Sequence, residues 1–241
     1  MQEIDNTALL AILLFIFVPI FVSYKQALKL EKDILWSSLR GFVQLLLLGY
    51  FISHIFSFER WYVILGYVLI MVITASMSVS KRGIEFKRTF WIVFLGITVS
   101  VSSSICLWLV FRVIPFQAQY IIPVAGMFSG TAMVASGVVL ESMKKEESKN
   151  EKEIKRNAIK IAMIPTIDTL KTMGLVQIPG TMTGMILAGA EPIAAVKYQI
   201  FIVFTLLVVA SISSIIVGIL NYRVFYQTNI FQQPYENNLS S

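Results

Sequence analysis

Two acidic residues stand at or inside apolar stretches, where a carboxylate could bind a cation. Glu141 ends one apolar run, and Asp168 lies within residues 164–189, a stretch that also holds two prolines and four glycines. A charged side chain at the centre of a bilayer costs about 2.5–3.5 kcal/mol on insertion scales, so it often marks a functional site. Glu141 and Asp168 are therefore candidate residues of a path through the membrane.

Four small residues and one proline could shape a path through the membrane. Small residues four positions apart let helices pack closely, whereas short segments interrupted by Gly and Pro are typical of the substrate sites of transporters. Both interpretations remain open. With Glu141 and Asp168, the candidate pathway residues are Gly126, Gly130, Pro179, Gly180 and Gly184.

The sequence gives little support for an enzyme. His54 is the only histidine and Cys106 the only cysteine, which excludes an HExxH zinc motif, an internal disulfide and a cysteine cluster. No GxxxxGK[ST] loop occurs, so the chain does not hydrolyse ATP through such a loop. The ten methionines could bind a soft metal ion, but methionine is also ordinary core filler. We expect no enzyme, and no cofactor bound by this chain.

The composition predicts an all-α integral membrane protein with one transmembrane domain over residues 1–241. The chain is 56% hydrophobic and 14% charged, with a mean hydropathy of +0.75, whereas soluble domains carry about 25% charged residues. The net charge of +6 fits lysine- and arginine-rich cytoplasmic loops. We therefore expect contact with membrane lipid and no binding to nucleic acid.

Apolar runs predict about seven membrane spans. Lysine and arginine gather in the first, third and fifth loops, which the positive-inside rule places in the cytoplasm. We expect the N-terminus outside and the C-terminus in the cytoplasm, in a multi-pass protein of the inner or plasma membrane. The predicted spans are residues 7–24, 35–56, 61–80, 90–112, 120–142, 175–190 and 197–221.

Residues 143–172 predict a charged cytoplasmic linker that becomes an amphipathic helix near residue 152. Ile154, Ala158 and Ile161 fall at i, i+4 and i+7, which places them on one helix face. This helix either lies at the membrane interface or docks a cytoplasmic partner. The candidate docking residues are Ile154, Arg156, Ile161 and Lys171.

The same helix leads into the unusual sixth span. Asp168 and Lys171 are three residues apart, so they share a helix face and can pair at the membrane surface. The helix would turn at Gly174 into a short span over residues 175–190 that is broken near Pro179. Sixteen helical residues rise about 24 Å, less than the hydrocarbon core of about 30 Å.

Residues 30–50, 122–137 and 164–189 resemble three sequence blocks of the FetB-type ABC-transporter permeases. The resemblance covers nearly the whole chain, in the expected order. It implies a permease subunit that works with a separate cytoplasmic ATP-binding subunit, as two permeases with two ATPases and with ATP bound by the partner. Bacterial members are associated with iron export and plant relatives with aluminium tolerance. Iron prefers hard oxygen or imidazole ligands, so if this chain binds iron directly, Glu141 is the first candidate ligand and Asp168 the second. The fifth loop departs from the family by passing directly from charged linker into basic helix.

An ABC permease that exports iron or a related metal is therefore the main hypothesis. The alternative is a secondary transporter driven by an ion gradient, since such proteins also contain buried carboxylates and broken helices. A third hypothesis, a membrane scaffold, does not explain a short, interrupted span.

Overall fold

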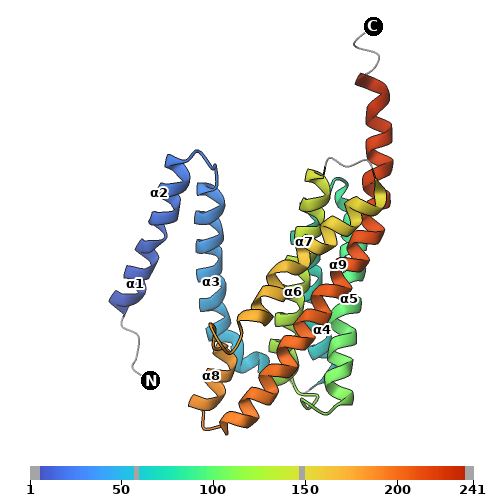
Figure 1. The fold of residues 1–241 in the computed structure, drawn as a ribbon. Helices are drawn as coiled ribbons and strands as arrows, with labels where there is room; N and C mark the ends of the chain where they lie inside the picture. The colour runs from blue at the N-terminus through green and yellow to red at the C-terminus, as the bar shows by residue number, and fades with distance from the viewer. Residues whose placement is uncertain (1–5, 57–59, 147–149, 237–241) are drawn as a thin grey trace. The chain divides into compact units, whose positions relative to one another are not determined.

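The computed structural model describes residues 6–56, 60–146 and 150–236, which form α-helices joined by short connections, with no strand among them. Contacts divide the chain into an N-terminal unit, Met1–Phe58, and a C-terminal unit, Glu59–Ser241. Figure 1 shows the helices of both units. The predicted all-α membrane class is confirmed in this coarse form.

The N-terminal unit contains three helices: α1 (Asn6–Phe15), α2 (Phe17–Lys25) and α3 (Glu31–Phe56). The first predicted span is thus two short helices, because Pro19 has no N–H to donate to the carbonyl four residues earlier. The turn after α2 is held by Ser23, whose Oγ donates to Glu31 Oε1 at 2.8 Å and accepts from the backbone N–H of Leu30 at 3.1 Å.

α3 begins at Glu31, before its predicted start at residue 35. Arg40 lies in the third turn of α3, within the apolar section Glu31–Ile52. Gln44 follows one turn later, and both side chains are exposed within the N-terminal unit. The apolar section of α3 therefore carries a charge and an amide.

The C-terminal unit contains six helices: α4 (Trp61–Ser80), α5 (Phe86–Val110), α6 (Ala118–Lys145), α7 (Glu151–Thr172), α8 (Gly180–Leu187) and α9 (Pro192–Glu236). Among the described residues, five helices are long and apolar enough to cross a membrane: α4, α5, α6, Glu31–Ile52 of α3 and Pro192–Val224 of α9. They coincide with five of the seven predicted spans. The total number of crossings stays a prediction.

The core of the C-terminal unit forms where α5, α6 and α9 meet. Trp108 of α5 is fully buried, and its Nε1 donates to Thr205 Oγ1 of α9 at 2.8 Å. The rings of Phe128, Tyr198 and Phe201 form T-shaped pairs with the indole, with centroids 5.5, 5.6 and 6.0 Å away. Edge-to-face packing is a favoured aromatic geometry, so this cluster joins the three helices.

α7 and α8 run antiparallel to α9 in the C-terminal unit (Figure 1). Later residues of the α7–α8 segment meet earlier residues of α9, which fixes the register between them. Four contacts define this register. The Lys155 Nζ lies 5.0 Å from the Tyr222 ring centroid, and Ile159 packs over Gly218. The Met163 Sδ lies 3.7 Å from the Ser211 Oγ, and the Thr181 hydroxyl donates to the Gln199 carbonyl oxygen.

The segment after α7 is interrupted. α7 ends at Thr172, which is the predicted end of the amphipathic helix. Gly174 then adopts a positive φ of 83°, which glycine accommodates readily. α8 starts directly after Pro179, where the break was predicted. However, α8 has only eight residues and a length of about 12 Å, so it cannot cross a core of about 30 Å alone. The predicted span over residues 175–190 is therefore not one helix.

We predict that Gly218→Leu destabilises the protein, because a Cβ at this position would lie 2.9 Å from the Ile159 Cγ1. Overpacking of this kind typically costs about 1–3 kcal/mol of unfolding free energy. Gly66→Leu is the matched control, since a Cβ there meets nothing within 4 Å. Thermal unfolding in detergent measures both variants, and equal melting temperatures would contradict the packing of α7 on α9.

Candidate functional site

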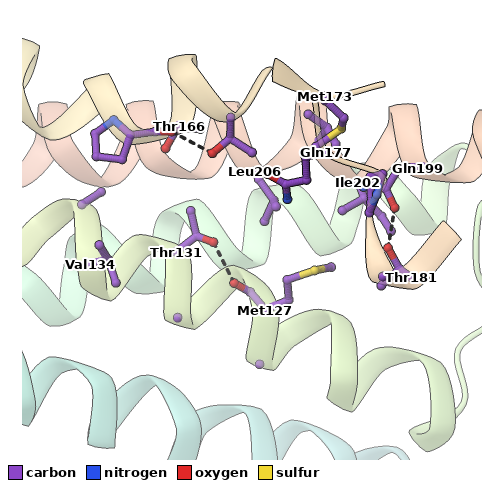
Figure 2. A pocket seen from close by; sticks show the side chains of 18 of the residues that line it. Met127, Thr131, Val134, Thr166, Met173, Gln177, Thr181, Gln199, Ile202 and Leu206 are labelled. Carbon is purple, nitrogen blue, oxygen red and sulfur yellow. Dashed lines mark hydrogen bonds between the residues drawn. The ribbon is translucent and has the colours of Figure 1, made fainter. Parts of the chain in front are cut away.

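A cavity of about 570 Å³ lies among α6, α7, α8 and α9, beside the interrupted segment (Figure 2). One wall is the face of α6 around Met127 and Thr131, and α9 supplies the apolar side chains of Ile202 and Leu206. The connection between α7 and α8 contributes Met173. A cavity of this size and composition is within the usual range of small-ligand sites.

The polar groups of the cavity are neutral. Among the described residues, no charged side chain lines it. Thr131 donates its hydroxyl hydrogen to the Met127 carbonyl at 3.0 Å, and Thr169 donates to the Pro165 carbonyl at 2.8 Å. The oxygen lone pairs of these hydroxyls thus remain available to a cation or a hydrogen-bond donor. The polar lining residues are Thr131, Thr166, Thr169, Gln177, Thr181 and Gln199.

Thr181 and Gln199 tie the start of α8 to α9. Gln199 is buried, with 7% of its surface exposed, and its side-chain carbonyl accepts the hydrogen of the Thr181 hydroxyl (Figure 2). A buried amide needs such a partner, because burial of an unpaired polar group is costly. This hydrogen bond holds the first turn of α8 at the cavity.

Four of the predicted pathway residues line the cavity: Gly126, Gly130, Pro179 and Gly180. A Cβ added to Gly130 or Gly180 would meet nothing within 4 Å, so in this chain these glycines keep space open rather than permit close packing. A Cβ at Gly126 would make an ordinary contact of 3.5 Å with Met71 of α4. Gly184 does not line the cavity, and a Cβ there also meets nothing.

Glu141 lies outside the cavity, in an ion pair with Arg82. The Arg82 Nη1 approaches the Glu141 Oε1 to 2.9 Å, and both side chains are about half exposed. Arg82 passes over Gly137, where an added Cβ would lie 3.1 Å from its Nη1. Gly137 therefore makes room for a contact between the α4–α5 turn and the end of α6.

Asp168 also lies outside the cavity and pairs with Lys171 at 3.0 Å. The predicted metal ligands Glu141 and Asp168 are thus each engaged by a cation of their own, and the cavity brings neither of them to a shared site. Among the residues that the structure describes, no group of three or more His, Cys, Asp or Glu side chains could hold a metal ion.

The predicted docking face of α7 requires correction. Ile154 is 5% exposed, and the buried stripe continues through Ala158 to Ala162 at i, i+4 and i+8. Ile161 lies off this stripe and is 45% exposed. Ile154 therefore packs within the C-terminal unit and is unavailable to a partner, whereas Arg156, Ile161 and Lys171 are exposed.

Sequence reasoning missed the neutral polar side chains of the cavity. Gln177 and Gln199 stood within predicted spans, and amides within apolar segments were the available signal. The threonines gave a weaker signal, because a helical threonine can satisfy its own hydroxyl through the preceding turn. The packing of α6, α7 and α9 brings these side chains together around one cavity.

Comparison with known proteins places the chain in a family. The model of a family described as "Uncharacterised protein family (UPF0014)" matches residues 6–157 and 151–226. The chain belongs to this family. The UPF0014 chain is thus a multi-pass membrane protein, in agreement with its long apolar helices. No solved structure matches it.

Several relatives of this UPF0014 chain carry names. It is 36% identical over 244 residues to "Probable iron export permease protein FetB" of Escherichia coli (strain K12), with 94% of each chain covered. It is 36% identical to "UPF0014 membrane protein YjkA" of Bacillus subtilis, covering 97% of this chain and 99% of that protein. "Protein ALUMINUM SENSITIVE 3" of Arabidopsis thaliana is 31% identical, covering 92% and 89%. The family resemblance deduced from the sequence is confirmed.

We predict that the Arg82–Glu141 ion pair contributes little stability. Exposed pairs are worth about 0–1 kcal/mol, so a double-mutant cycle of Arg82→Gln and Glu141→Gln should give a coupling energy within that range. Chemical unfolding in detergent measures it, and a coupling above about 2 kcal/mol would contradict the exposed geometry. A metal-binding role for Glu141 would show differently, as a change in metal flux with Glu141→Gln that Arg82→Gln does not reproduce.

Proposed function

We propose that this chain is the permease subunit of an ABC transporter that exports iron or a related metal, with energy from a separate ATP-binding subunit. The relationship to a protein named as a probable iron export permease supports the permease role and the cargo. The observation that carries the proposal is the cavity beside the break between α7 and α8. Interrupted helices of this kind form the substrate sites of many transporters.

We further propose that α7 and α8 together make the sixth membrane crossing. Their contacts with α9 extend from Tyr222 to Gln199, about 23 residues at 1.5 Å each, or about 34 Å. That length exceeds the hydrocarbon core of about 30 Å. The second half of α7 would then enter the membrane instead of remaining on its surface. Together with α1–α2 and the five long helices, this crossing makes seven.

Under this proposal the break lies next to the cavity, near the end of the crossing where Thr181 meets Gln199. Hydroxyl and amide oxygens there would replace part of the hydration shell of the cargo, while the apolar walls exclude bulk water. The ATP-binding subunit would act from the cytoplasmic side on the exposed start of α7, where Arg156 lies. Movement of α7 would reach the cavity through Thr166 and Thr169, which stand in its wall.

We predict that Gly180→Leu leaves the protein inserted but lowers metal flux by about tenfold or more, equivalent to a barrier about 1.4 kcal/mol higher. The leucine would project from a position that lines the cavity and has no neighbour within 4 Å of its Cβ. Gly184→Leu is the matched control on the same helix, because Gly184 does not line the cavity. Flux into proteoliposomes is the measurement, and unchanged flux in Gly180→Leu would remove this cavity from the pathway.

The energy source is tested by purification and reconstitution. We expect an ATP-binding protein to co-purify from native membranes and ATP hydrolysis to drive flux in vesicles that contain both subunits. The interrupted helix is equally compatible with a secondary transporter. Flux that follows a proton gradient without any ATPase, and is lost in Asp168→Asn, would favour that alternative and refute the ABC assignment.

A further inference from the structure

One face of α3 carries polar side chains from the start of the helix to its middle. Asp33, Ser37, Arg40 and Gln44 are separated by four, three and four residues, so they lie on one side of the helix. All four are exposed within the N-terminal unit. Beyond Gln44 the same side becomes apolar, and Phe51 stands there two turns on. We call Asp33, Ser37, Arg40 and Gln44 the polar face of α3.

The polar face lies opposite the face that packs on α1 and α2. Leu35, Leu39 and Phe42 line a small cavity of about 240 Å³ that α3 forms with those two helices. Successive residues of an α-helix are rotated by about 100°, so the centre of the polar face is about 180° from the centre of this packed face. The described helices of the N-terminal unit therefore leave the polar face uncovered.

Lipid is an unfavourable neighbour for the polar face. Gln44 lies 13 residues after the start and eight before the end of the apolar section Glu31–Ile52, which corresponds to about 20 Å and 12 Å along the helix. Arginine can extend its guanidinium toward a membrane edge, but the short Gln44 side chain reaches neither edge. An amide without hydrogen-bond partners is costly in hydrocarbon. The polar face therefore borders protein or water.

Arg40 indicates what the polar face binds. No ion pair among the described residues includes Arg40. Its guanidinium is always charged, and its N–H groups fit the paired oxygens of a carboxylate or phosphate. The Gln44 amide adds N–H donors one turn farther along the same face. Together, Arg40 and Gln44 are suited to an anionic ligand that has oxygen atoms.

The cavity of the C-terminal unit independently favours a metal complex over a bare ion. Its lining carries hydroxyl and amide groups but, within the described part of the chain, no carboxylate. Removing a bare divalent or trivalent cation from water is costly, and proteins usually repay this cost with carboxylate ligands. The volume of about 570 Å³ is in the range of small-molecule sites and exceeds what one ion needs. A metal ion that arrives with oxyanion ligands of its own suits both places.

We propose that the polar face of α3 lines a water-filled path open to the cytoplasm, and that Arg40 and Gln44 at its end bind the oxyanion groups of a metal complex. Under the predicted topology the start of α3 is cytoplasmic, which is the side from which an exporter takes its cargo. The cargo is then a metal ion held by carboxylate or phosphate groups rather than a bare cation. This cargo rests on the proposed function, whereas the path and the anion site rest on α3 alone.

Thiol labelling tests the water-filled path without any cargo. In a Cys106→Ser background, Gln44→Cys should react with a charged methanethiosulfonate added to inside-out membrane vesicles, because the reactive thiolate forms in water and not in lipid. Val43→Cys is the matched control, since Val43 is 45% exposed on a neighbouring face of α3 at the same depth. Labelling after denaturation verifies that both cysteines are present. If Gln44→Cys reacts no faster than Val43→Cys, the path is absent and the inference fails.

The charge of Arg40 is tested with the same cysteine. An anionic methanethiosulfonate should modify Gln44→Cys at least about tenfold faster than a cationic one, after correction for their rates with a free thiol, because a positive charge raises the local concentration of anions. Arg40→Gln should abolish this preference. Lys32→Gln, which removes the same charge at the start of α3 but off the polar face, should retain it. Equal rates, or a preference that survives Arg40→Gln, would overturn the anion site.

The cargo class is tested by protection of Gln44→Cys with iron in three forms: anaerobic Fe²⁺ alone, ferric citrate and ferric pyrophosphate. We expect at least one of the two complexes to slow labelling about tenfold, and Fe²⁺ alone to leave the rate unchanged. Protection by the citrate complex would indicate carboxylate ligands, and protection by the pyrophosphate complex phosphate ligands. Protection by Fe²⁺ alone, or by neither complex, would overturn this cargo class.

These labelling measurements need no ATP-binding subunit, which separates the inference from the proposed function. ATP-driven iron flux in vesicles in which Gln44→Cys stays unlabelled would leave the proposed function standing and remove the anion site. Labelling of Gln44→Cys with the expected preference for an anionic reagent, but without ATP-driven flux, would leave the anion site standing and remove the proposed function.

Discussion

The backbone of a membrane-spanning segment must satisfy its own hydrogen bonds, because the bilayer core offers no water. The connection between α7 and α8, which crosses the membrane under the proposed function, satisfies part of this requirement within itself: the Gly174 N–H donates to the Gln177 carbonyl at 2.9 Å, and the Val176 N–H donates to the Thr172 carbonyl at 2.9 Å. Such an irregular segment persists where protein or a water-filled cavity surrounds it. The neighbouring cavity, with Gln177 in its wall, is therefore part of what makes the break tolerable.

α7 connects the features on which the proposed function depends. Its buried stripe holds it to the C-terminal unit, and Thr166 and Thr169 reach the cavity. Under the proposed function, a helix with these two faces would transmit a force from its exposed start to the cavity. The Arg82–Glu141 pair lies outside the cavity. It joins the α4–α5 turn to the end of α6.

The long helices were predictable because the length and polarity of an apolar run are local properties. The span over residues 61–80 coincides with α4, and that over 120–142 lies inside α6. The break near Pro179 was predictable for the same reason, since proline removes a donor wherever it stands. The start of α3 was predicted four residues late, because this boundary depends on the turn that Ser23 holds. Ile154 was misassigned because periodicity identifies an apolar stripe but not what covers it.

The sequence by itself determined the membrane class, the family, the long helices and the position of the break, since each depends on residue type and spacing along the chain. The tertiary structure decided which polar groups converge. It placed Thr181 against Gln199, and it left Glu141 and Asp168 in separate ion pairs outside the cavity. The physical reason is that a cavity belongs to no single helix. Its shape follows from the register of α7 and α8 against α9, which is set by contacts such as Ile159 over Gly218.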